Sequence, residues 1–312
     1  QDGIRRMEAV LGGDAGKSGQ IAKAYLWSGL ANKLLGENMC QAVIDGGPAL
    51  PSTTFLETAE AQLTKAITVA QAAGDDNTRL AALASRASVR MDRKDWAGAA
   101  QDATAVPESF SLRAVYFPTN ESTYNVWAYA VESSPFRTVS VWNTPYQKYY
   151  EDTKDPRTPW ANHPTQKFGD NARPCCGPVP FLVQKKFPRR DSPIDITDGR
   201  EMLLVRAEAA LVGGDMATAM QLINRLRTTV GVAPWPNPGS LADAWSYLKA
   251  ERGIELWLEG KRMNDLRRWK ESGRPGALRP LEDPANPQTY LERQDLCFPI
   301  PLTEIRTNVN LR

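Results

Sequence analysis

Apolar residues recur at helical spacing over most of the chain. The clearest stretch begins near Ser18, a residue suited to cap a helix, and ends near Gly36. The inner face of this helix is expected to carry Ile21, Tyr25, Leu26, Leu30, Leu34 and Leu35. The same spacing predicts helices over residues 4–11 and 54–73, each followed by glycine. The sequence therefore predicts a mainly α-helical chain.

Two segments carry small and turn-forming residues at the same offsets. The matched positions are Ala87, Asp95, Trp96 and Ala99 in residues 78–106, and Ala207, Asp215, Met216 and Ala219 in residues 202–226. This arrangement is typical of tetratricopeptide hairpins, in which small residues lie where two helices touch. Residues 18–73 and 240–270 read as weaker copies, which makes about four hairpins in all. The alternative is a set of unrelated helical hairpins.

The stretch from Glu251 to Trp269 reads as the last hairpin, with two helices that meet at Gly260. It mixes apolar residues with acids before the turn and bases mainly after it. The charged positions are Glu251, Arg252, Glu255, Glu259, Lys261, Arg262, Arg267 and Arg268. An unpaired buried charge costs several kcal/mol, so these groups are expected to pair. We predict Glu–Arg contacts that hold the two helices together.

Residues 107–198 lose the helical period and are rich in proline and aromatic residues. Short strands within Arg137–Trp142 and a short helix over Thr144–Tyr150 are the expected elements. Because a compact domain rarely contains so long a structureless segment, we interpret this part as an irregular, aromatic-rich lobe packed on the hairpins. The expected organisation is a single domain, 1–312, with hairpin pairs at 18–106 and 199–270, the lobe at 107–198 and a C-terminal strap at 271–312.

Composition narrows the classes of function. The 38 basic residues nearly balance the 36 acidic ones, so no electrostatic capture of nucleic acid is expected. No apolar run is long enough to span a membrane. The four cysteines, Cys40, Cys175, Cys176 and Cys297, permit two disulfides with three connectivities. Because a bond between neighbours is strained, we favour Cys175 and Cys176 paired separately with Cys40 and Cys297; free buried thiols are the alternative.

Motifs for catalysis, cofactors and metals are missing. His163 is the only histidine and no CxxC spacing exists, so no metal site is expected. The segment GGDAGKS, Gly12 to Ser18, lacks the first glycine and the preceding strand of a phosphate-binding loop. No GxSxG motif occurs, and nothing marks two carboxylates as a glycosidase pair. We expect neither an enzyme nor a cofactor.

Aromatic residues are the positive signal for binding. Between Tyr116 and Trp160 they alternate with polar residues, as in platforms on which sugar rings stack and form hydrogen bonds. The candidate ligand-binding residues of this segment are Trp142, Asn143, Tyr146, Tyr149, Tyr150 and Trp160. The alternative is that most of these aromatic residues form the core of the lobe.

The last hairpin also carries a family resemblance. Its pattern ELxxEGxRxxDLxRW is formed by Glu255, Leu256, Glu259, Gly260, Arg262, Asp265, Leu266, Arg268 and Trp269. This pattern resembles the signature near the C-terminus of SusD/RagB-type nutrient-binding lipoproteins of bacterial outer membranes. Asp155-Pro156-Arg157 is similar to a DPR motif of that family, and the segment from Pro299 to Leu311 is similar to its C-terminal tail.

The resemblance implies a fold, a partner and a location. Such proteins have an embedded four-repeat scaffold and are lipid-anchored lids over a SusC-like, TonB-dependent β-barrel transporter. They capture oligosaccharides or peptides at the cell surface without catalysis. Their ligand site is built from loops, one of which corresponds here to Asn38 to Pro51, so Asn38 and Asp45 join the candidates.

Two further expectations accompany this resemblance. Family members usually begin with a lipoprotein signal and an acylated cysteine, whereas the first residues here read like a cut or processed end inside a helix. The alternative function is a structural or protein-interaction scaffold built on the tetratricopeptide-like repeats.

Overall fold

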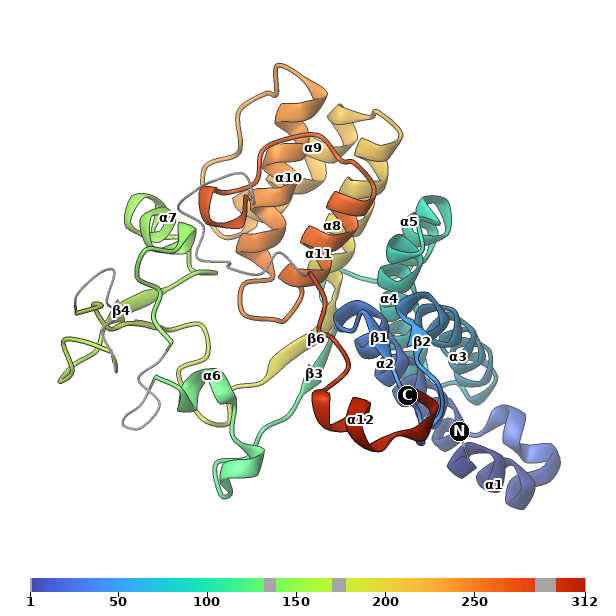
Figure 1. Cartoon of the computed structure of the whole chain (residues 1–312). Coiled ribbons are helices and arrows are strands. Elements are labelled where there is room, and N and C mark those ends of the chain that lie inside the picture. The colour runs from blue at the N-terminus through green and yellow to red at the C-terminus, as the bar shows by residue number, and fades with distance from the viewer. Residues whose placement is uncertain (1, 132–138, 170–177, 284–295, 312) are drawn as a thin grey trace.

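The computed structural model describes residues 2–131, 139–169, 178–283 and 296–311, and within them the chain is mainly helical (Figure 1). The N-terminal group of helices comprises α1 (Asp2–Leu11), α2 (Gly19–Asn38), α3 (Ser52–Ala73), α4 (Asp76–Asp92) and α5 (Trp96–Thr104). The later group comprises α8 (Gly199–Val212), α9 (Met216–Thr229), α10 (Leu241–Glu255) and α11 (Arg262–Glu271). The prediction of a mainly α-helical chain is confirmed.

Short elements complete the fold. Three pairs of antiparallel strands are formed by β1 (Gln41–Ala42) with β2 (Leu50–Pro51), β3 (Ser111–Ala114) with β6 (Ile194–Asp198), and β4 (Trp160–Asn162) with β5 (Leu182–Gln184). The remaining helices are α6 (Val126–Tyr129), α7 (Pro145–Thr153) and α12 (Leu302–Thr307), with 3₁₀ turns at Gly12–Lys17, Glu121–Thr123, Pro280–Glu282 and Val309–Leu311. Strands β3 and β6 run between the helices and the lobe that carries α6, α7 and β4 (Figure 1).

Helix pairs lie where the offsets predict them. The side chain of Asp95 caps α5 and that of Asp215 caps α9, each accepting a hydrogen bond of 3.0 Å from the backbone three residues on. The small residues at the matched offsets, Ala87, Ala99, Ala207 and Ala219, are fully buried. The same local sequence therefore makes the same turn in both pairs.

Helices α2 and α3 lie unusually close together. A β-carbon added at Gly29 would stand 2.7 Å from the Leu63 side chain, and one at Gly36 would stand 2.6 Å from Leu56. Without side chains at these two glycines the helices approach until the leucines fill the gap. The loop between them, which holds β1 and β2, is therefore carried by a rigid pair.

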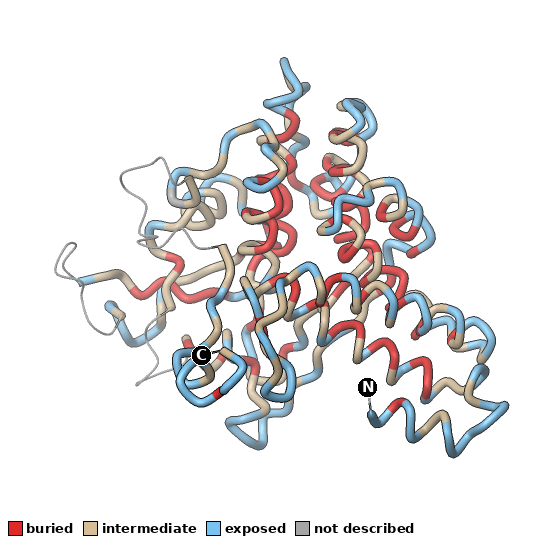
Figure 2. Tube along the Cα trace, turned by 45° about the vertical axis from the view of Figure 1, so that its right-hand side comes forward, coloured by how far each residue is buried: buried red, intermediate tan, exposed pale blue. Residues whose placement is uncertain are grey.

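Two apolar cores meet at α8. The first gathers residues of α1 to α5 and takes Met202 and Val205 from α8. The second holds Leu203, Leu204 and Ala207 of the same helix against α9, α10 and α11. Buried residues accordingly follow the helices of both groups in Figure 2. Helix α8 joins the two groups into one packed body.

The charges of the last hairpin pair differently from the prediction. The two helices are joined by Arg252 and Asp265, whose side chains form hydrogen bonds of 2.8 and 2.9 Å. Glu251 and Glu255 turn instead to arginines outside the hairpin, and Glu259 pairs with Lys186 at 2.8 Å. The predicted Glu–Arg contacts within the hairpin are therefore wrong, because the glutamates face the lobe rather than α11.

Asp155 and Arg157 fasten the lobe to α10. Both Asp155 oxygens accept hydrogen bonds from Arg157, at 3.0 and 2.7 Å. Arg157 Nη1 also donates to Glu251 at 2.6 Å and to Glu255 at 2.7 Å. All four side chains are buried. The lobe is thus attached to α10 through the buried glutamates of the last hairpin.

The elements expected in the lobe are borne out in part. Helix α7 lies where the pattern over Thr144–Tyr150 predicts a helix. No strand is found over residues 139–142, the described part of the expected strand segment; Arg137 lies outside the described residues.

The C-terminal tail is tied to the loop between α2 and α3. A disulfide joins Cys40 to Cys297 with their Cα atoms 5.0 Å apart. The backbone of Phe298 bonds to Asn38 and Cys40 at 2.7 and 2.9 Å, and Asn308 Nδ2 donates to the Gly47 carbonyl at 2.8 Å. The expected pairing of these cysteines with Cys175 and Cys176 is wrong for Cys40 and Cys297; the neighbours themselves lie outside the described residues.

None of the helices in the described part of the chain combines the length and the apolar character needed to cross a lipid bilayer.

Candidate ligand-binding site

The aromatic residues predicted to bind ligand lie around α7 and β4. Trp142, Tyr146 and Trp160 pack against a small apolar core of Val141, Leu182 and Trp257. The rings of Tyr146 and Trp257 are 5.4 Å apart, and Trp160 Nε1 donates to the Gln147 carbonyl at 3.1 Å. Part of each of these rings is therefore engaged in holding the lobe together.

Tyr149 belongs to the polar network of the lobe. Its hydroxyl donates to Asp155 at 2.5 Å and accepts a hydrogen bond of 3.1 Å from Arg227. Burial, with the hydrogen bond to Asp155, raises the pKa of Tyr149 to about 12. Tyr146 also has a raised pKa, caused mainly by burial. Both hydroxyls therefore stay protonated at any physiological pH.

Of the remaining two candidates of this segment, Tyr150 is half-buried and Asn143 is exposed. Tyr150 contacts the edge of Trp160 at 6.0 Å between ring centres, under the ammonium group of Lys154. Asn143 is exposed, adopts a positive φ of 56°, and donates its backbone N–H to Gln147 Oε1 at 2.7 Å. The structure thus brings all six predicted residues of this segment into one region, at one end of the molecule in Figure 1.

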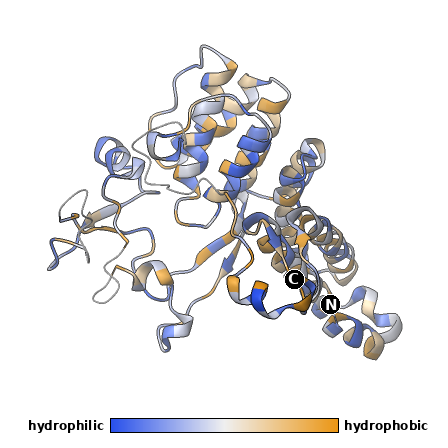
Figure 3. Cartoon of the chain, viewed as in Figure 1, coloured by the Kyte–Doolittle hydropathy of each residue, from blue (hydrophilic) through white to orange (hydrophobic). Residues whose placement is uncertain are grey.

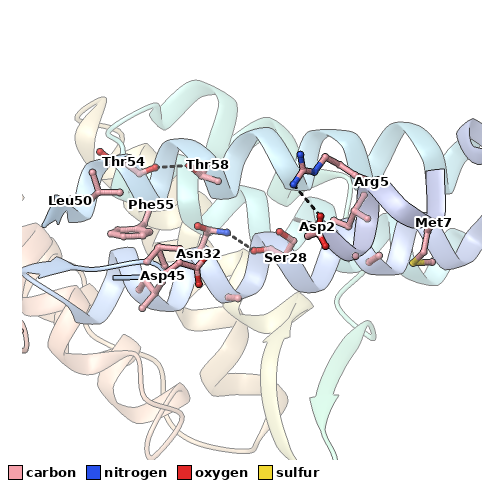
Figure 4. A pocket seen from close by; sticks show the side chains of 16 residues that line it. Asp2, Arg5, Met7, Ser28, Asn32, Asp45, Leu50, Thr54, Phe55 and Thr58 are labelled. Carbon is pink, nitrogen blue, oxygen red and sulfur yellow. Dashed lines mark hydrogen bonds and ion pairs between the residues drawn. The ribbon is translucent and has the colours of Figure 1, made fainter. Parts of the chain in front are cut away.

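The other two candidates lie away from that region, and each lines a cavity of its own. Asp45 lines a cavity of about 850 Å³ between α1, α2, α3 and the loop before β2 (Figure 4). Three of its polar side chains bond locally: Arg5 to Asp2, Asn32 to the Ser28 carbonyl and Thr58 to the Thr54 carbonyl. With walls of Ile4, Met7, Leu35, Leu50 and Phe55, this cavity is mainly apolar.

Asn38 lines a second cavity, of about 550 Å³, which we call the α2–sheet cavity. One wall is the outer face of α2, the opposite wall is the β3–β6 sheet with Tyr116, and the turn at Glu259 to Lys261 forms an end. Trp27 and Leu34, both on the α2 wall, are 53% and 63% exposed. The expectation that Leu34 lies on the inner face of its helix is therefore wrong.

The aromatic side chains of this cavity come from two separate elements. Trp27 projects from α2, and Tyr116 follows β3. Burial raises the pKa of Tyr116, which keeps its hydroxyl protonated and able to donate. The sequence analysis predicted neither Trp27 nor Tyr116 as a ligand-binding residue. The available signal was Trp27, a large aromatic residue outside the apolar face assigned to its own helix.

The charged residues that line the α2–sheet cavity are all paired. Lys33 pairs with Glu37 at 2.7 Å, and Asp195 with Arg113 at 3.0 Å. Glu259 pairs with Lys186 at 2.8 Å, and Lys261 lies 3.7 Å from Glu201. These are polar groups held in place by their partners.

Two of these charges have strongly shifted pKa values. Burial raises the pKa of Glu259 to about 7, although Lys186 and Lys261 act in the opposite direction. Burial would lower the pKa of Lys261, but the carboxylates of Glu201, Glu37 and Glu259 outweigh it and raise that pKa above its ordinary value. The ammonium group of Lys261 therefore stays charged at any physiological pH, while the carboxyl group of Glu259 titrates near neutrality.

The chemistry that this cavity supports is binding of a polar, partly apolar molecule. Its volume lies within the roughly 300–1,000 Å³ of ordinary ligand pockets. The exposed indole and the tyrosine provide stacking surfaces, and Asn38 with the paired charges supplies hydrogen-bond donors and acceptors. Among the described residues no cluster of His, Cys, Asp and Glu is arranged to hold a metal ion.

Comparison with known proteins identifies the relatives of this chain. Residues 200–312 match the sequence model described as the SusD family. No curated protein matches the chain. A SusD superfamily protein from Bacteroides fragilis NCTC 9343 is similar in structure with a TM-score of 0.69 at 13% identity, over 93% of this chain and 78% of its own.

Two further solved structures share the fold. A SusD-like carbohydrate binding protein from the same strain matches with a TM-score of 0.59 at 17% identity, over 94% of this chain and 80% of its own. Surface glycan-binding protein A from Bacteroides uniformis matches with a TM-score of 0.57 at 16% identity, over 80% of this chain and 66% of its own. This chain thus spans slightly less than two thirds of the latter protein.

Proposed function

We propose that this chain is a member of the SusD/RagB family, and that it binds oligosaccharide or peptide nutrients at a bacterial cell surface and delivers them to a TonB-dependent transporter in the outer membrane. Two structural relatives are named for carbohydrate or glycan binding, and one of them is named a surface protein. In this proposal the helix pairs α2–α3, α4–α5, α8–α9 and α10–α11 form a tetratricopeptide-like scaffold that carries the aromatic-rich lobe.

The observation that carries the proposal is the α2–sheet cavity. The exposed Trp27 on a rigid helix, opposite a sheet wall with Tyr116 and beside charges held in ion pairs, matches the composition of sites that hold sugar rings. The residues around α7 stay a prediction as a second region of ligand contact, since Trp142, Tyr150 and Trp160 are only partly buried.

The proposal is one of capture, without catalysis. Glycoside hydrolysis needs two carboxyl groups that face one cleft, with one free to donate a proton and one to act on the sugar or on water. In the α2–sheet cavity Glu37, Asp195 and Glu259 are each bound to a basic side chain. This pairing suits them to orient a ligand through hydrogen bonds.

Contact with a protein partner is supported by the C-terminal tail. Four large apolar side chains of this segment are exposed, namely Phe298, Leu302, Ile305 and Val309. Apolar positions of this tail are visible around α12 in Figure 3. Exposed apolar groups of this kind are a common feature of protein interaction sites. We propose a SusC-like β-barrel transporter as the partner.

Isothermal titration against a panel of oligosaccharides and peptides tests the binding function. We expect saturable binding of at least one class. Absence of binding by a chain whose folding is verified by circular dichroism would overturn the proposal and favour the alternative, a protein-interaction scaffold.

Affinity purification from solubilised outer membranes tests the delivery function. A large β-barrel protein should copurify with the tagged chain. Recovery of only soluble proteins would contradict the transporter partnership and leave ligand binding to be judged by titration.

A further inference from the structure

We propose that the α2–sheet cavity takes an uncharged oligosaccharide, and that it discriminates against uronic acid glycans. This inference rests on the proposed function and narrows its ligand class. It depends on how the charges in the cavity wall are paired, on which aromatic face is open, and on the apolar residues of the sheet wall.

The charges of the wall balance locally. The five charged lining residues, with the partners named above, place the cations Lys33, Lys261, Arg113 and Lys186 against the carboxylates Glu37, Glu259, Asp195 and Glu201. An anionic ligand would bring an additional negative charge to a wall whose cations are already neutralised by carboxylates. Taking that charge out of water costs free energy that a locally neutral wall does not return. An uncharged ligand brings no such charge.

Fixed ion pairs still form hydrogen bonds with hydroxyl groups. A carboxylate has several lone pairs, and an ammonium group has three donor hydrogens, so one ion-pair contact leaves capacity for others. Asn38 adds an amide near the end of α2. Sugar hydroxyls both donate and accept hydrogen bonds, which matches a wall where donors and acceptors alternate.

The open aromatic face belongs to Trp27. The side chain is 53% exposed, whereas Ile21 and Leu26 of the same helix are buried. Leu34, two turns later on α2, is 63% exposed on the same cavity wall. This apolar strip leads from Trp27 toward Asn38, so an extended ligand with apolar ring faces and polar edges fits along it.

The sheet wall of the cavity is mainly apolar. It is lined by Ala114, Ile194, Asp195 and Ile196 of the two strands and by Tyr116, which follows β3. Asp195 is the charged residue of this wall, and Arg113 pairs with it at 3.0 Å. The wall therefore offers apolar contact to the C–H faces of sugar rings and holds its charge in an ion pair.

The test combines a ligand panel with matched variants. Titrations at pH 8, above the pKa of Glu259, would use uncharged gluco-, xylo- and mannooligosaccharides, oligogalacturonates of equal length, and mixed peptides. We expect an uncharged oligosaccharide to bind with an affinity that changes little between about 50 and about 500 mM NaCl, because salt screens only charged ligands.

The variants separate this cavity from other aromatic sites. Trp27→Ala should weaken binding by about tenfold or more, as for a central aromatic contact, while Trp27→Phe retains most of the affinity. Phe168→Ala is the matched control, because Phe168 is an aromatic residue of similar exposure, 49%, outside the cavity lining. Its affinity should equal that of the unmodified chain. Because Trp27 is half exposed, the variant is expected to fold, which thermal denaturation verifies.

Each of the other possible outcomes contradicts a specific part of this proposal. If an oligosaccharide binds and Trp27→Ala has no effect, the cavity is not its site, although the proposed function stands. If oligogalacturonates or peptides bind in preference and Trp27→Ala weakens them, the ligand class inferred here is wrong and the site is right. If nothing binds to the folded chain, the proposed function fails together with this inference.

Discussion

Removal of the Arg157 side chain is the sharpest test of how the lobe is held. This guanidinium is 7% exposed and donates to Asp155 of its own segment and to Glu251 and Glu255 of α10. Within the described residues no other side chain joins all three carboxylates. The change Arg157→Ala leaves Glu251 with Arg227 and Trp235, and Glu255 with Arg200, and removes the ion pairs of these two carboxylates with the lobe.

The size of the effect follows from burial. Breaking a buried ion pair by removing one partner costs about 3–5 kcal/mol, because the other charge stays buried. At about 2.1 cal/mol/K per residue, the entropy of unfolding of 312 residues is about 0.65 kcal/mol/K. We therefore expect the melting temperature to fall by about 5–8 °C at pH 7.

Thermal denaturation, followed by calorimetry and by circular dichroism, measures this change. Arg189→Ala is the matched control, since Arg189 lies in the same lobe, is 74% exposed and pairs only with Asp191 among the ion pairs of the described residues. Surface ion pairs contribute about 0–1 kcal/mol, so this variant should melt within about 1–2 °C of the unmodified chain.

The pH dependence gives a second readout. The pKa of Glu255 is below its ordinary value: burial would raise it, but Arg200 and Arg157 outweigh burial. A carboxyl group whose pKa is lower in the folded than in the unfolded state stabilises the fold at pH values above its unfolded pKa. This stabilisation is lost as the pH falls through the folded pKa. In Arg157→Ala the carboxyl group of Glu255 loses one of these two arginines and protonates more readily, so the difference in melting temperature should shrink from pH 7 to pH 4.5. A loss no larger than that of Arg189→Ala, or one independent of pH, would refute the reasoning.

Three further changes test other parts of the fold. Gly36→Ala places a β-carbon 2.6 Å from Leu56, so α2 and α3 must separate; we expect a loss of about 1–3 kcal/mol in urea denaturation. Asp198→Asn keeps the cap on α8 but removes a carboxyl whose pKa burial raises to about 7. Because a raised carboxyl pKa makes stability fall as the pH rises from about 4 to 7, the variant should gain stability at pH 8 and little at pH 4. The double change of Cys40 and Cys297 to serine opens a link across 257 residues and should cost about 2–4 kcal/mol in the same assay.

Local patterns predicted the helices because helix formation depends on neighbouring residues. The turn at Asp95 needs only an aspartate whose side chain reaches the backbone three residues on, and the same holds at Asp215. The amphipathic spacing placed α2 and α3 within a few residues of their observed ends. The match of residues 200–312 to the SusD family model was also predictable, since the signature and the tail are linear patterns.

The ligand site could not be read in the same way. Six of the eight candidate residues meet around α7, but Asn38 and Asp45 line two separate cavities. The position of a loop depends on the tertiary contacts beneath it, which the local sequence does not reveal. Trp27 was passed over since its exposure depends on the opposite wall, which comes from strands more than eighty residues away. Aromatic content alone does not distinguish a ring that stacks on Trp257 from one open to ligand.

The sequence by itself determined that the chain is helical, that two hairpins turn at aspartates that cap their second helices, and that charges in the last hairpin must pair. Only the tertiary structure decided which partners they take. Arg157 meets Glu251 across 94 positions, and Cys40 meets Cys297 across 257. The physical reason is range: capping and amphipathic spacing act within a few residues, whereas ion pairs, disulfides and cavity walls depend on the packing of the whole chain.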